Sequence, residues 1–239
     1  MKILLTNDDG FNSKGIKILY KALQKYGDVT LIAPTHHQSG KSASLSFKPL
    51  SLMKHDEKIF SLDGTPADCV SFATRYFAND WDIVVSGCNN GLNIVYDTCY
   101  SGTIGACIES LIFGIPSIAI STDIDNFDIV EKEIDKVFNY VFTNNLVENG
   151  FMLNINFPTI EHLESKGFKL TSVGQRKDEV TWHKQEDGMY VPNRRVIWEN
   201  IEGEETDSQA VKEGYISITP LVYSHFSEKH YVKLKDKIK

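Results

Sequence analysis

Cysteine is scarce in this sequence. The 239 residues include only four, and no two of them follow the Cys-x-x-Cys spacing of structural zinc sites. We therefore expect no zinc site and predict that the thiols are free and buried. Because no disulfide-forming pattern is present, we also expect a cytoplasmic location. The four residues are Cys69, Cys88, Cys99 and Cys107.

Long apolar runs and an excess of positive charge are missing as well. No stretch resembles a membrane span or a secretory signal, because the first residues pass directly into a strand-like run. The net charge of −7 argues against a nucleic-acid-binding surface, which needs a dominant basic patch. The sequence therefore predicts neither a membrane partner nor a nucleic-acid partner. Its 41% hydrophobic content fits a globular, enzyme-sized chain.

Strand-like and helix-like segments alternate through the first two thirds of the chain. The predicted helices carry apolar residues at helical spacing, and two of them begin at good N-cap residues, Ser13 and Thr65. This alternation predicts an α/β fold with a doubly wound, mostly parallel, Rossmann-like sheet. Strands are expected to end near residues 6, 33, 86, 121 and 156, and helices are expected over about 13–27, 65–77, 103–114 and 127–141.

Two segments break this alternation. Residues 44–62 have apolar residues at every second position in places, which predicts an antiparallel excursion. Residues 168–223 alternate β-branched and aromatic residues with charged ones, and we interpret them as β-hairpin extensions rather than further βαβ units. Within them, the acidic residues 199–207 are expected to form a solvated loop. The lysine-rich residues 229–239 are expected to form a surface helix or C-terminal arm.

The first predicted strand ends in two adjacent carboxylates, Asp8 and Asp9, followed by Gly10. Two ionised carboxylates in one crevice repel each other, so one must be protonated or a cation must compensate both. A divalent metal ion is the common compensation. The alternative is a plain turn that ends the strand, since Asp-Asp-Gly is frequent in turns.

The next two strand ends add further oxygen donors. Residues 35–42 follow the second strand and include Ser39, and residues 87–93 follow the third and include Asn89. Ligands bind at the carboxyl ends of parallel strands, near the point where strand order reverses. A set of oxygen donors suits Mg²⁺, Mn²⁺ or Ca²⁺ and disfavours zinc. The candidate metal ligands are Asp8, Asp9, Ser39 and Asn89.

Two histidines, His36 and His37, lie close to Ser39 in the sequence. They are candidates for metal ligands or acid–base groups. However, no second cluster of histidine or cysteine completes such a site. We expect both to be exposed loop residues.

A small turn, Tyr100-Ser101-Gly102-Thr103, comes directly before a predicted helix. Such a turn leaves backbone N–H groups open at a helix N-terminus, where phosphate binds readily. The alternative is ordinary N-capping by Ser101. Beside a carboxylate metal site, an anion-binding turn indicates a phosphate ester held for metal-assisted hydrolysis.

Together these motifs resemble the SurE family, the survival-protein nucleotidases. The matching landmarks run in family order along nearly the whole chain, so the set is specific although no single motif is decisive. They are Thr6-Asn7-Asp8-Asp9-Gly10, Ala33-Pro34 with Ser39, Gly64-Thr65-Pro66-Ala67-Asp68-Cys69-Val70, Ser86-Gly87-Cys88-Asn89-Asn90-Gly91-Leu92-Asn93, Ser101-Gly102-Thr103, Pro116-Ser117-Ile118-Ala119, Leu153-Asn154-Ile155-Asn156 and Gly214-Tyr215-Ile216-Ser217-Ile218-Thr219-Pro220.

The resemblance implies a divalent-metal phosphatase acting on nucleoside 5′- and 3′-monophosphates, with some members also trimming short polyphosphate. It implies one Mg²⁺ or Mn²⁺ ion per subunit. It further implies homodimers or homotetramers with exchanged C-terminal arms. We expect a single α/β domain over residues 1–239, with a nucleotide- and metal-binding core at 1–157. Residues 158–239 would then carry the hairpin extensions and the oligomerisation arm.

By position, the resemblance places the metal ligands on the same four residues as the strand-end argument: Asp8, Asp9, Ser39 and Asn89. It places the phosphate contacts on Asn93, Ser101, Gly102 and Thr103. Two positions depart from the family pattern. Cys88 replaces the usual aliphatic residue, which is benign, whereas Asn90 stands where arginine is common and removes a positive charge near the site.

The implied mechanism is hydrolysis by a metal-activated water, with Asp8 and Asp9 as the catalytic carboxylates. The two carboxylates are adjacent, whereas aspartyl-phosphate enzymes use Asp-x-Asp spacing, and this favours water as the nucleophile. Two other functions use similar residues, namely a metal-dependent nucleotide-sugar transferase and a non-enzymatic nucleotide-binding stress protein.

Overall fold

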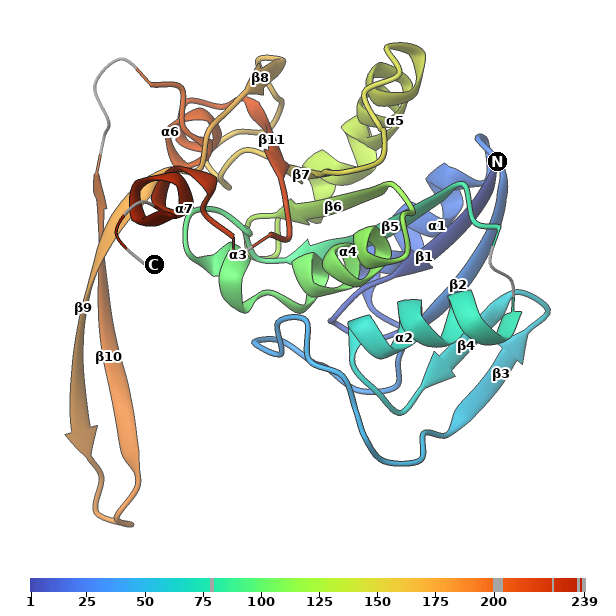
Figure 1. Ribbon diagram of the computed structural model, residues 1–239, viewed down its shortest axis with the longest axis horizontal. Coiled ribbons are helices and arrows are strands. Elements are labelled where there is room, and N and C mark those ends of the chain that lie inside the picture. Colours follow the sequence, from blue (N-terminus) through green and yellow to red (C-terminus); the bar gives the residue numbers. More distant parts are fainter. Residues whose placement is uncertain (78–79, 200–203, 225, 236, 238–239) are drawn as a thin grey trace.

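The computed structural model describes residues 1–77, 80–199, 204–224, 226–235 and 237. Within them, nine strands form one mixed sheet in the order β3-β4-β2-β1-β5-β6-β7-β11-β8 (Figure 1). The strands of this sheet are β1 Lys2–Thr6, β2 Asp28–Pro34, β3 Leu52–Asp56, β4 Ile59–Leu62, β5 Ile83–Asn90, β6 Ser117–Thr122, β7 Met152–Asn156, β8 Phe168–Leu170 and β11 Ile216–Leu221.

The centre of the sheet is parallel and winds in two directions from β1. Strand β1 pairs in parallel with β2 on one side and with β5 on the other. The chain therefore runs outward through β2, returns, and continues through β5, β6 and β7 in the opposite direction. The carboxyl ends of β1 and β5 meet at this reversal, which is where open α/β sheets bind ligands. The predicted doubly wound α/β sheet is confirmed.

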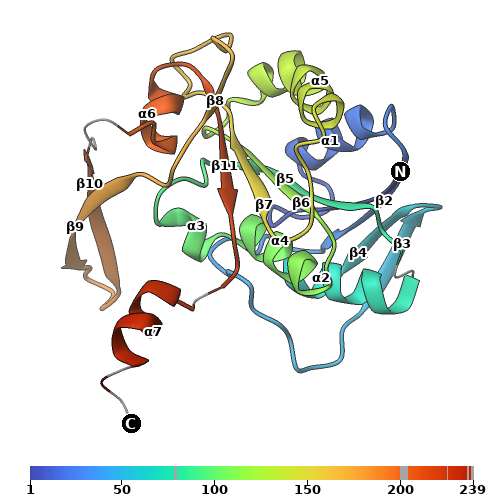
Figure 2. The same ribbon diagram turned by 45° about the horizontal axis from the view of Figure 1, so that its top comes forward.

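Helices cover both faces of the sheet (Figures 1 and 2). Ile3 and Leu5 of β1 pack with α1 and α5, whereas Leu4 points to the other face and packs with α2 and α4. The helices are α1 Lys14–Leu23, α2 Pro66–Phe72, α3 Asp97–Tyr100, α4 Gly102–Ile112, α5 Phe127–Thr143, α6 Asp207–Lys212 and α7 Glu228–Lys235, and a π-helical turn, Ala73–Phe77, extends α2.

The helix starts follow the expected capping chemistry. The Ser13 side chain accepts a hydrogen bond from the backbone N–H of Ile16 at the start of α1. At α2, Thr65 and Asp68 form a reciprocal capping box, with Pro66 at the first turn. Both helix starts were predicted from the sequence.

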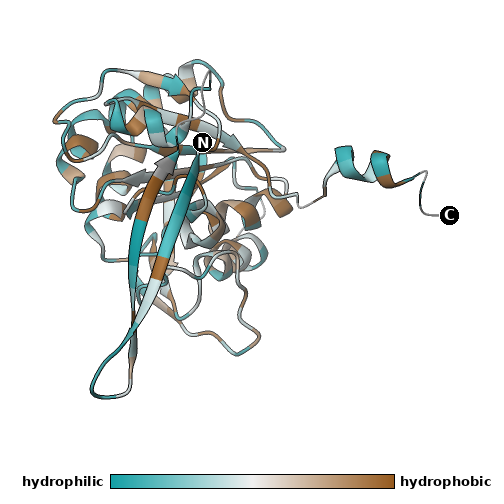
Figure 3. Cartoon of the chain, turned by 90° about the vertical axis from the view of Figure 1, so that its left-hand side faces the viewer, coloured by the Kyte–Doolittle hydropathy of each residue, from teal (hydrophilic) through white to brown (hydrophobic). Residues whose placement is uncertain are grey.

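The antiparallel and hairpin segments add structure at the edges. Strand β3 pairs antiparallel with β4, which confirms the predicted excursion, and β4 then joins β2 in parallel. Strands β9 (Gln175–Lys184) and β10 (Tyr190–Glu199) form a separate two-stranded hairpin. This hairpin and α7 extend away from the body of the molecule (Figure 3). None of the α7 residues is buried.

Some sequence predictions were wrong in detail. Strand β11 is not part of a hairpin extension: it pairs antiparallel with β7 in the main sheet, and β8 pairs with it in parallel. The predicted solvated loop 199–207 ends in a buried residue, Asp207, which begins α6; residues 200–203 of that prediction lie outside the described part of the chain. Alternation of apolar and charged residues fits an antiparallel sheet strand as well as a hairpin, because both have period two.

The cysteines are free, as predicted, and three of the four are buried. Cys99, on the short helix α3, is exposed and corrects the expectation of four buried thiols. Across the described ranges, no helix combines the length and the apolar character that crossing a membrane requires.

Candidate active site

The loops that follow β1, β2 and β5 contact one another at the carboxyl edge of the sheet. The backbone N–H of Gln38, in the loop after β2, donates to the carbonyl oxygen of Asp8 at 2.7 Å. The backbone N–H of Asn90, at the end of β5, donates to Oδ2 of Asp9 at 3.0 Å. The two predicted carboxylates therefore lie at the junction of all three loops.

Asp8 is buried, with an exposed fraction of 2%. The Thr103 hydroxyl, on the first turn of α4, donates to its Oδ1 at 2.7 Å. Burial raises the pKa of the Asp8 carboxyl above its ordinary value; the Thr103 hydrogen bond opposes this shift and the neighbouring Asp9 charge adds to it. Neither carboxylate has a lysine or arginine within ion-pair distance in the described part of the chain. The pair is therefore short of positive charge.

The N-terminus of α4 is packed directly against Asp8. A Cβ atom added to Gly102 would lie 2.9 Å from Cβ of Asp8, 3.1 Å from its Oδ2 and 3.2 Å from Cγ of Pro66. Real Cβ contacts essentially never fall below 3.0 Å, so only glycine allows this approach. The Ser101 side chain accepts from the backbone N–H of Ile104 at 3.2 Å and caps the helix. The predicted turn and the first carboxylate therefore form one unit.

Asp9 is more accessible and lies beside a cavity. Its Oδ1 is 3.3 Å from Nδ1 of His37, whose side chain is 63% exposed. The prediction that His37 is exposed is confirmed, but its contact with Asp9 was not foreseen. The cavity has a volume of about 510 Å³, and its lining residues are Asp9, Ser13, Lys14, Asn90, Asp125 and Phe127.

The remaining predicted residues lie around the same edge. Ser39 is exposed and lies in the loop after β2, next to Gln38, whose backbone N–H bonds to Asp8. Asn89 is half-buried at the end of β5, and its side-chain amide donates to the carbonyl oxygen of Gly91 at 2.6 Å. Asn93 is buried, and its side-chain amide donates to Oγ of Ser121 at 2.8 Å. In this structure Asn93 thus supports the loop after β5 from within.

The donor set fits a hard divalent cation better than zinc. Asp8, Asp9, Ser39 and Asn89 offer carboxylate, hydroxyl and amide oxygens, which are the ligands of Mg²⁺ and Mn²⁺. The described residues contain no group of three or more His, Cys, Asp or Glu that could hold a metal ion. This is consistent with a set in which only two ligands belong to those residue types. Asp8 and Asp9 lie side by side with no lysine or arginine partner among the described residues, and this arrangement is compatible with a bound cation.

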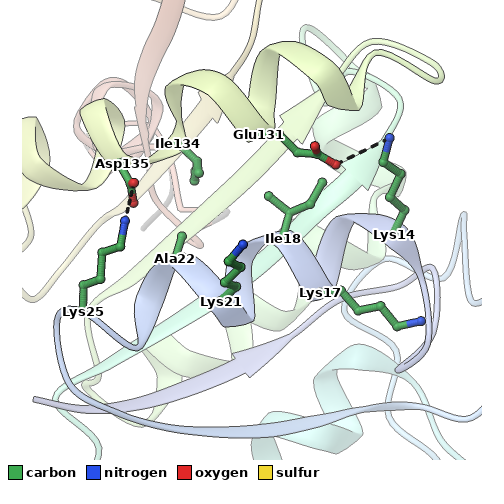
Figure 4. A pocket seen from close by; sticks show the side chains of 9 residues that line it. All are labelled: Lys14, Lys17, Ile18, Lys21, Ala22, Lys25, Glu131, Ile134 and Asp135. Atoms are coloured by element: carbon green, nitrogen blue, oxygen red, sulfur yellow. Dashed lines mark hydrogen bonds and ion pairs between the residues drawn. The ribbon is translucent and has the colours of Figure 1, made fainter.

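Another groove, of about 480 Å³, is lined by residues of α1 and α5 (Figure 4). Its lysines face carboxylates across the groove: Lys14 pairs with Glu131 at 3.6 Å, and Lys25 pairs with Asp135. Such exposed pairs contribute little to stability. None of the predicted site residues lines this groove.

Comparison with known proteins decides the family. Residues 3–180 match the family model described as "Survival protein SurE". The chain belongs to the SurE family. It is 35% identical to the 5′-nucleotidase SurE of Clostridium botulinum, with 98% of each chain covered, and 39% identical to that of Histophilus somni, with 92% of each covered. A crystal structure of the SurE protein from Aquifex aeolicus is 35% identical, covers 100% of both chains and superposes with a TM-score of 0.85.

The SurE assignment confirms the resemblance predicted from the strand-end motifs, and it makes the chain a member of an enzyme family of hydrolases. The Thr103–Asp8 hydrogen bond and the His37–Asp9 contact could not be foreseen from those motifs. Thr103 is 95 positions away from Asp8 in the sequence. No local pattern links residues so far apart.

Gly102→Ala should weaken metal binding and turnover together. Because the new Cβ would displace the Asp8 carboxylate, we expect Mn²⁺ affinity and kcat/KM for a mononucleotide each to fall by at least ~10-fold. Calorimetric titration with Mn²⁺ and a phosphate-release assay measure the two effects. Wild-type values for both would show that the approach of α4 does not control the site.

Ser101→Ala tests whether this residue does more than cap α4. Loss of the cap alone costs about 1 kcal/mol in the free energy of unfolding. We also expect kcat/KM to fall roughly tenfold, because a hydrogen bond to a charged phosphate is worth about 1.5–3 kcal/mol. Ser101→Thr retains the hydroxyl and is the matched control. Reduced stability with unchanged kcat/KM would leave Ser101 with the capping role only.

Proposed function

We propose that this chain hydrolyses nucleoside 5′- and 3′-monophosphates to nucleoside and phosphate, using one Mg²⁺ or Mn²⁺ ion per subunit. The observation that carries the proposal is the contact between α4 and Asp8, through Thr103 and Gly102. It brings a helix N-terminus, which favours anions, next to two carboxylates that have no lysine or arginine partner among the described residues. A phosphate group and a divalent cation are the complementary ligands of such a site.

Asp8, Asp9, Ser39 and Asn89 would hold the metal ion. When bound, the ion supplies Lewis acidity to a phosphoryl oxygen and lowers the pKa of a coordinated water. Asp8 is fixed by Thr103 and by the Gln38 amide, so its position is set before ligands arrive. Asp9 is the more accessible of the two and would also orient the attacking water. Its own carboxylate is held in place by a hydrogen bond from the backbone N–H of Asn90.

The first turn of α4 would bind the phosphate. A helix begins with N–H groups that have no intrahelical partner. The Ser101 hydroxyl is bonded to the N–H of Ile104, which leaves the N–H groups of Gly102 and Thr103 for non-bridging phosphate oxygens. These donors would gain strength as negative charge builds on those oxygens in the transition state. Asn93, in the loop after β5, would provide a further contact to the phosphate.

We also propose that the chain assembles into homodimers or homotetramers through its C-terminal arm and hairpin. The exposed apolar residues gathered there support this: Val180, Trp182, Tyr190 and Val191 on the hairpin, and Phe226 and Tyr231 near the C-terminus. Apolar side chains on extended arms are typical of interfaces. Sedimentation equilibrium should give a mass that is twice or four times 27.0 kDa. A monomer at micromolar concentration would contradict the proposal.

Removal of metal should abolish activity without unfolding the protein. The oxygen ligands bind the ion weakly enough for exchange, whereas the core is held by apolar packing. We expect EDTA to stop phosphate release from mononucleotides, the circular dichroism spectrum to persist, and Mn²⁺ to restore turnover. Phosphate release in water, with no acceptor present, also separates hydrolysis from group transfer. Full activity in a verified metal-free sample would disprove the metal mechanism.

Asp9→Asn should lower kcat by at least ~10²-fold with little change in melting temperature. The substitution removes ligand charge at a place where two carboxylates repel each other before metal binds. Asp125→Asn is the matched control, because Asp125 lines the same cavity but is not a predicted ligand. If Asp9→Asn keeps a kcat as close to wild type as Asp125→Asn does in a steady-state assay, Asp9 is only a turn residue.

A further inference from the structure

Helix α3 lies between the phosphate-binding turn and the base of the β9–β10 hairpin (Figures 1 and 2). It consists of four residues, Asp97–Tyr100, and passes directly into Ser101. The backbone N–H of Ser101 donates to the carbonyl oxygen of Asp97 at 3.0 Å. The position of α3 therefore sets the position of Ser101 in this turn.

A buried arginine of the hairpin holds α3. Arg176, the second residue of β9, has a side chain that is 2% exposed. Its two terminal nitrogens donate to the two carboxylate oxygens of Asp97, one of them at 2.5 Å. Its Nε lies 3.0 Å from Oδ1 of Asp178, a carboxylate that also pairs with Arg194. A bidentate pair of this kind fixes both distance and orientation, which a single ion pair does not.

A second link fixes the segment just before α3. The buried Asp207 carboxylate accepts hydrogen bonds from the backbone N–H groups of Val95, Gly174 and Ser208, at 3.0, 2.9 and 2.7 Å. A Cβ on Gly174 would lie 2.5 Å from Oγ of Ser208, so a side chain there would separate the hairpin base from α6. The segments that lead into Asp97 and into Arg176 are thus joined through one buried carboxylate.

On its other side, α3 contacts the loop that carries Ser39. The backbone N–H of Ser42 donates to the carbonyl oxygen of Tyr100 at 3.0 Å, and the Ser42 hydroxyl donates to that of Cys99 at 2.9 Å. Displacement of α3 would therefore disturb the phosphate-binding turn directly and the Ser39 loop through Ser42.

We infer that Arg176 is a positioning residue for the phosphate-binding turn: by its bidentate pair with Asp97 it fixes α3, and α3 fixes Ser101 and the residues that follow. The geometry of the turn at Ser101 thus depends on the base of the hairpin. This inference rests on the proposed function for its catalytic readout, but the coupling itself is a property of the fold. Structural support alone would lower stability, whereas positioning also changes phosphate affinity.

The test compares Arg176→Ala with Arg176→Lys and Arg195→Ala in the full-length protein. For each, one measures KM for a nucleoside 5′-monophosphate, the inhibition constant of inorganic phosphate, Mn²⁺ affinity and melting temperature. For Arg176→Ala we expect KM and the phosphate inhibition constant to rise roughly tenfold, with a smaller change in Mn²⁺ affinity. Arg176→Lys keeps the charge but loses the fork of donors, so it should recover only part of the loss.

Arg195→Ala is the matched control, because it removes one positive charge from the same hairpin at a residue that pairs with Glu179 instead of Asp97; it should keep wild-type KM. If Arg176→Ala does not fold, Asp97→Asn breaks the pair from the side that is 33% exposed and should give the same rise in KM. Unchanged KM and phosphate inhibition in the folded variants would overturn the inference.

Hydrogen exchange separates failure of this inference from failure of the proposed function. We expect the backbone amides of Ser101 and Ile104 to exchange faster in Arg176→Ala than in Arg195→Ala. If the wild-type protein hydrolysed no mononucleotide, the proposed function would be wrong, yet faster exchange would still support the coupling. Equal exchange in the two variants would overturn the coupling whatever the activity.

Discussion

The contact between Asp8 and the first turn of α4 is the constraint on which the candidate site depends. A buried carboxylate next to another carboxylate is unfavourable unless donors or cations offset its charge. The Thr103 hydroxyl supplies one donor, and Gly102 lets the positive end of the helix come close. These contributions are partial, and the pKa of Asp8 remains raised. The remaining deficit of positive charge is what a divalent cation would fill.

The sheet topology explains why these groups meet. Strand β1 lies between β2 and β5, so the loops after all three strands end at one place, where the winding direction reverses. Short polar contacts then set the geometry of this edge. The backbone N–H of Gln38 donates to the carbonyl oxygen of Asp8, and the backbone N–H of Asn90 donates to the carboxylate of Asp9. Farther out, the Arg176–Asp97 pair joins the hairpin to the same edge. The site is therefore held by backbone and ion-pair contacts rather than by apolar packing alone.

Much of the core could be predicted from local patterns. Strand ends, capping residues and glycine stops depend on neighbours within a few positions, so β1, β2 and the helix starts at Ser13 and Thr65 were readable in the sequence. The predicted end of β5 near residue 86 was wrong, because the strand continues to Asn90 after an irregularity between Ser86 and Asn89. The family resemblance rested on the residues at those strand ends, and the comparisons confirm it. The assignment of individual ligands remains a prediction.

Features that depend on tertiary contact could not be predicted. Asp207 lies in an acidic stretch whose composition predicts a solvent-exposed loop, yet its carboxylate is buried and accepts hydrogen bonds from three backbone N–H groups. Strand β11 has the alternation of a hairpin, but its partner is β7, more than sixty residues earlier in the chain. His37 reaches Asp9 only because the loop after β2 folds back onto Asp8. Each outcome is decided by a distant partner rather than by the local sequence.

In the proposed function, one cation and one phosphate share the edge between Asp8 and α4. The most direct test is a crystal of this protein grown with Mn²⁺ and inorganic phosphate, with the metal located by anomalous diffraction. We predict one Mn²⁺ ion coordinated by Asp8, Asp9, Ser39 and Asn89, with phosphate on the N–H groups of Gly102 and Thr103. A Mn²⁺ ion bound elsewhere, or phosphate bound away from the start of α4, would contradict it.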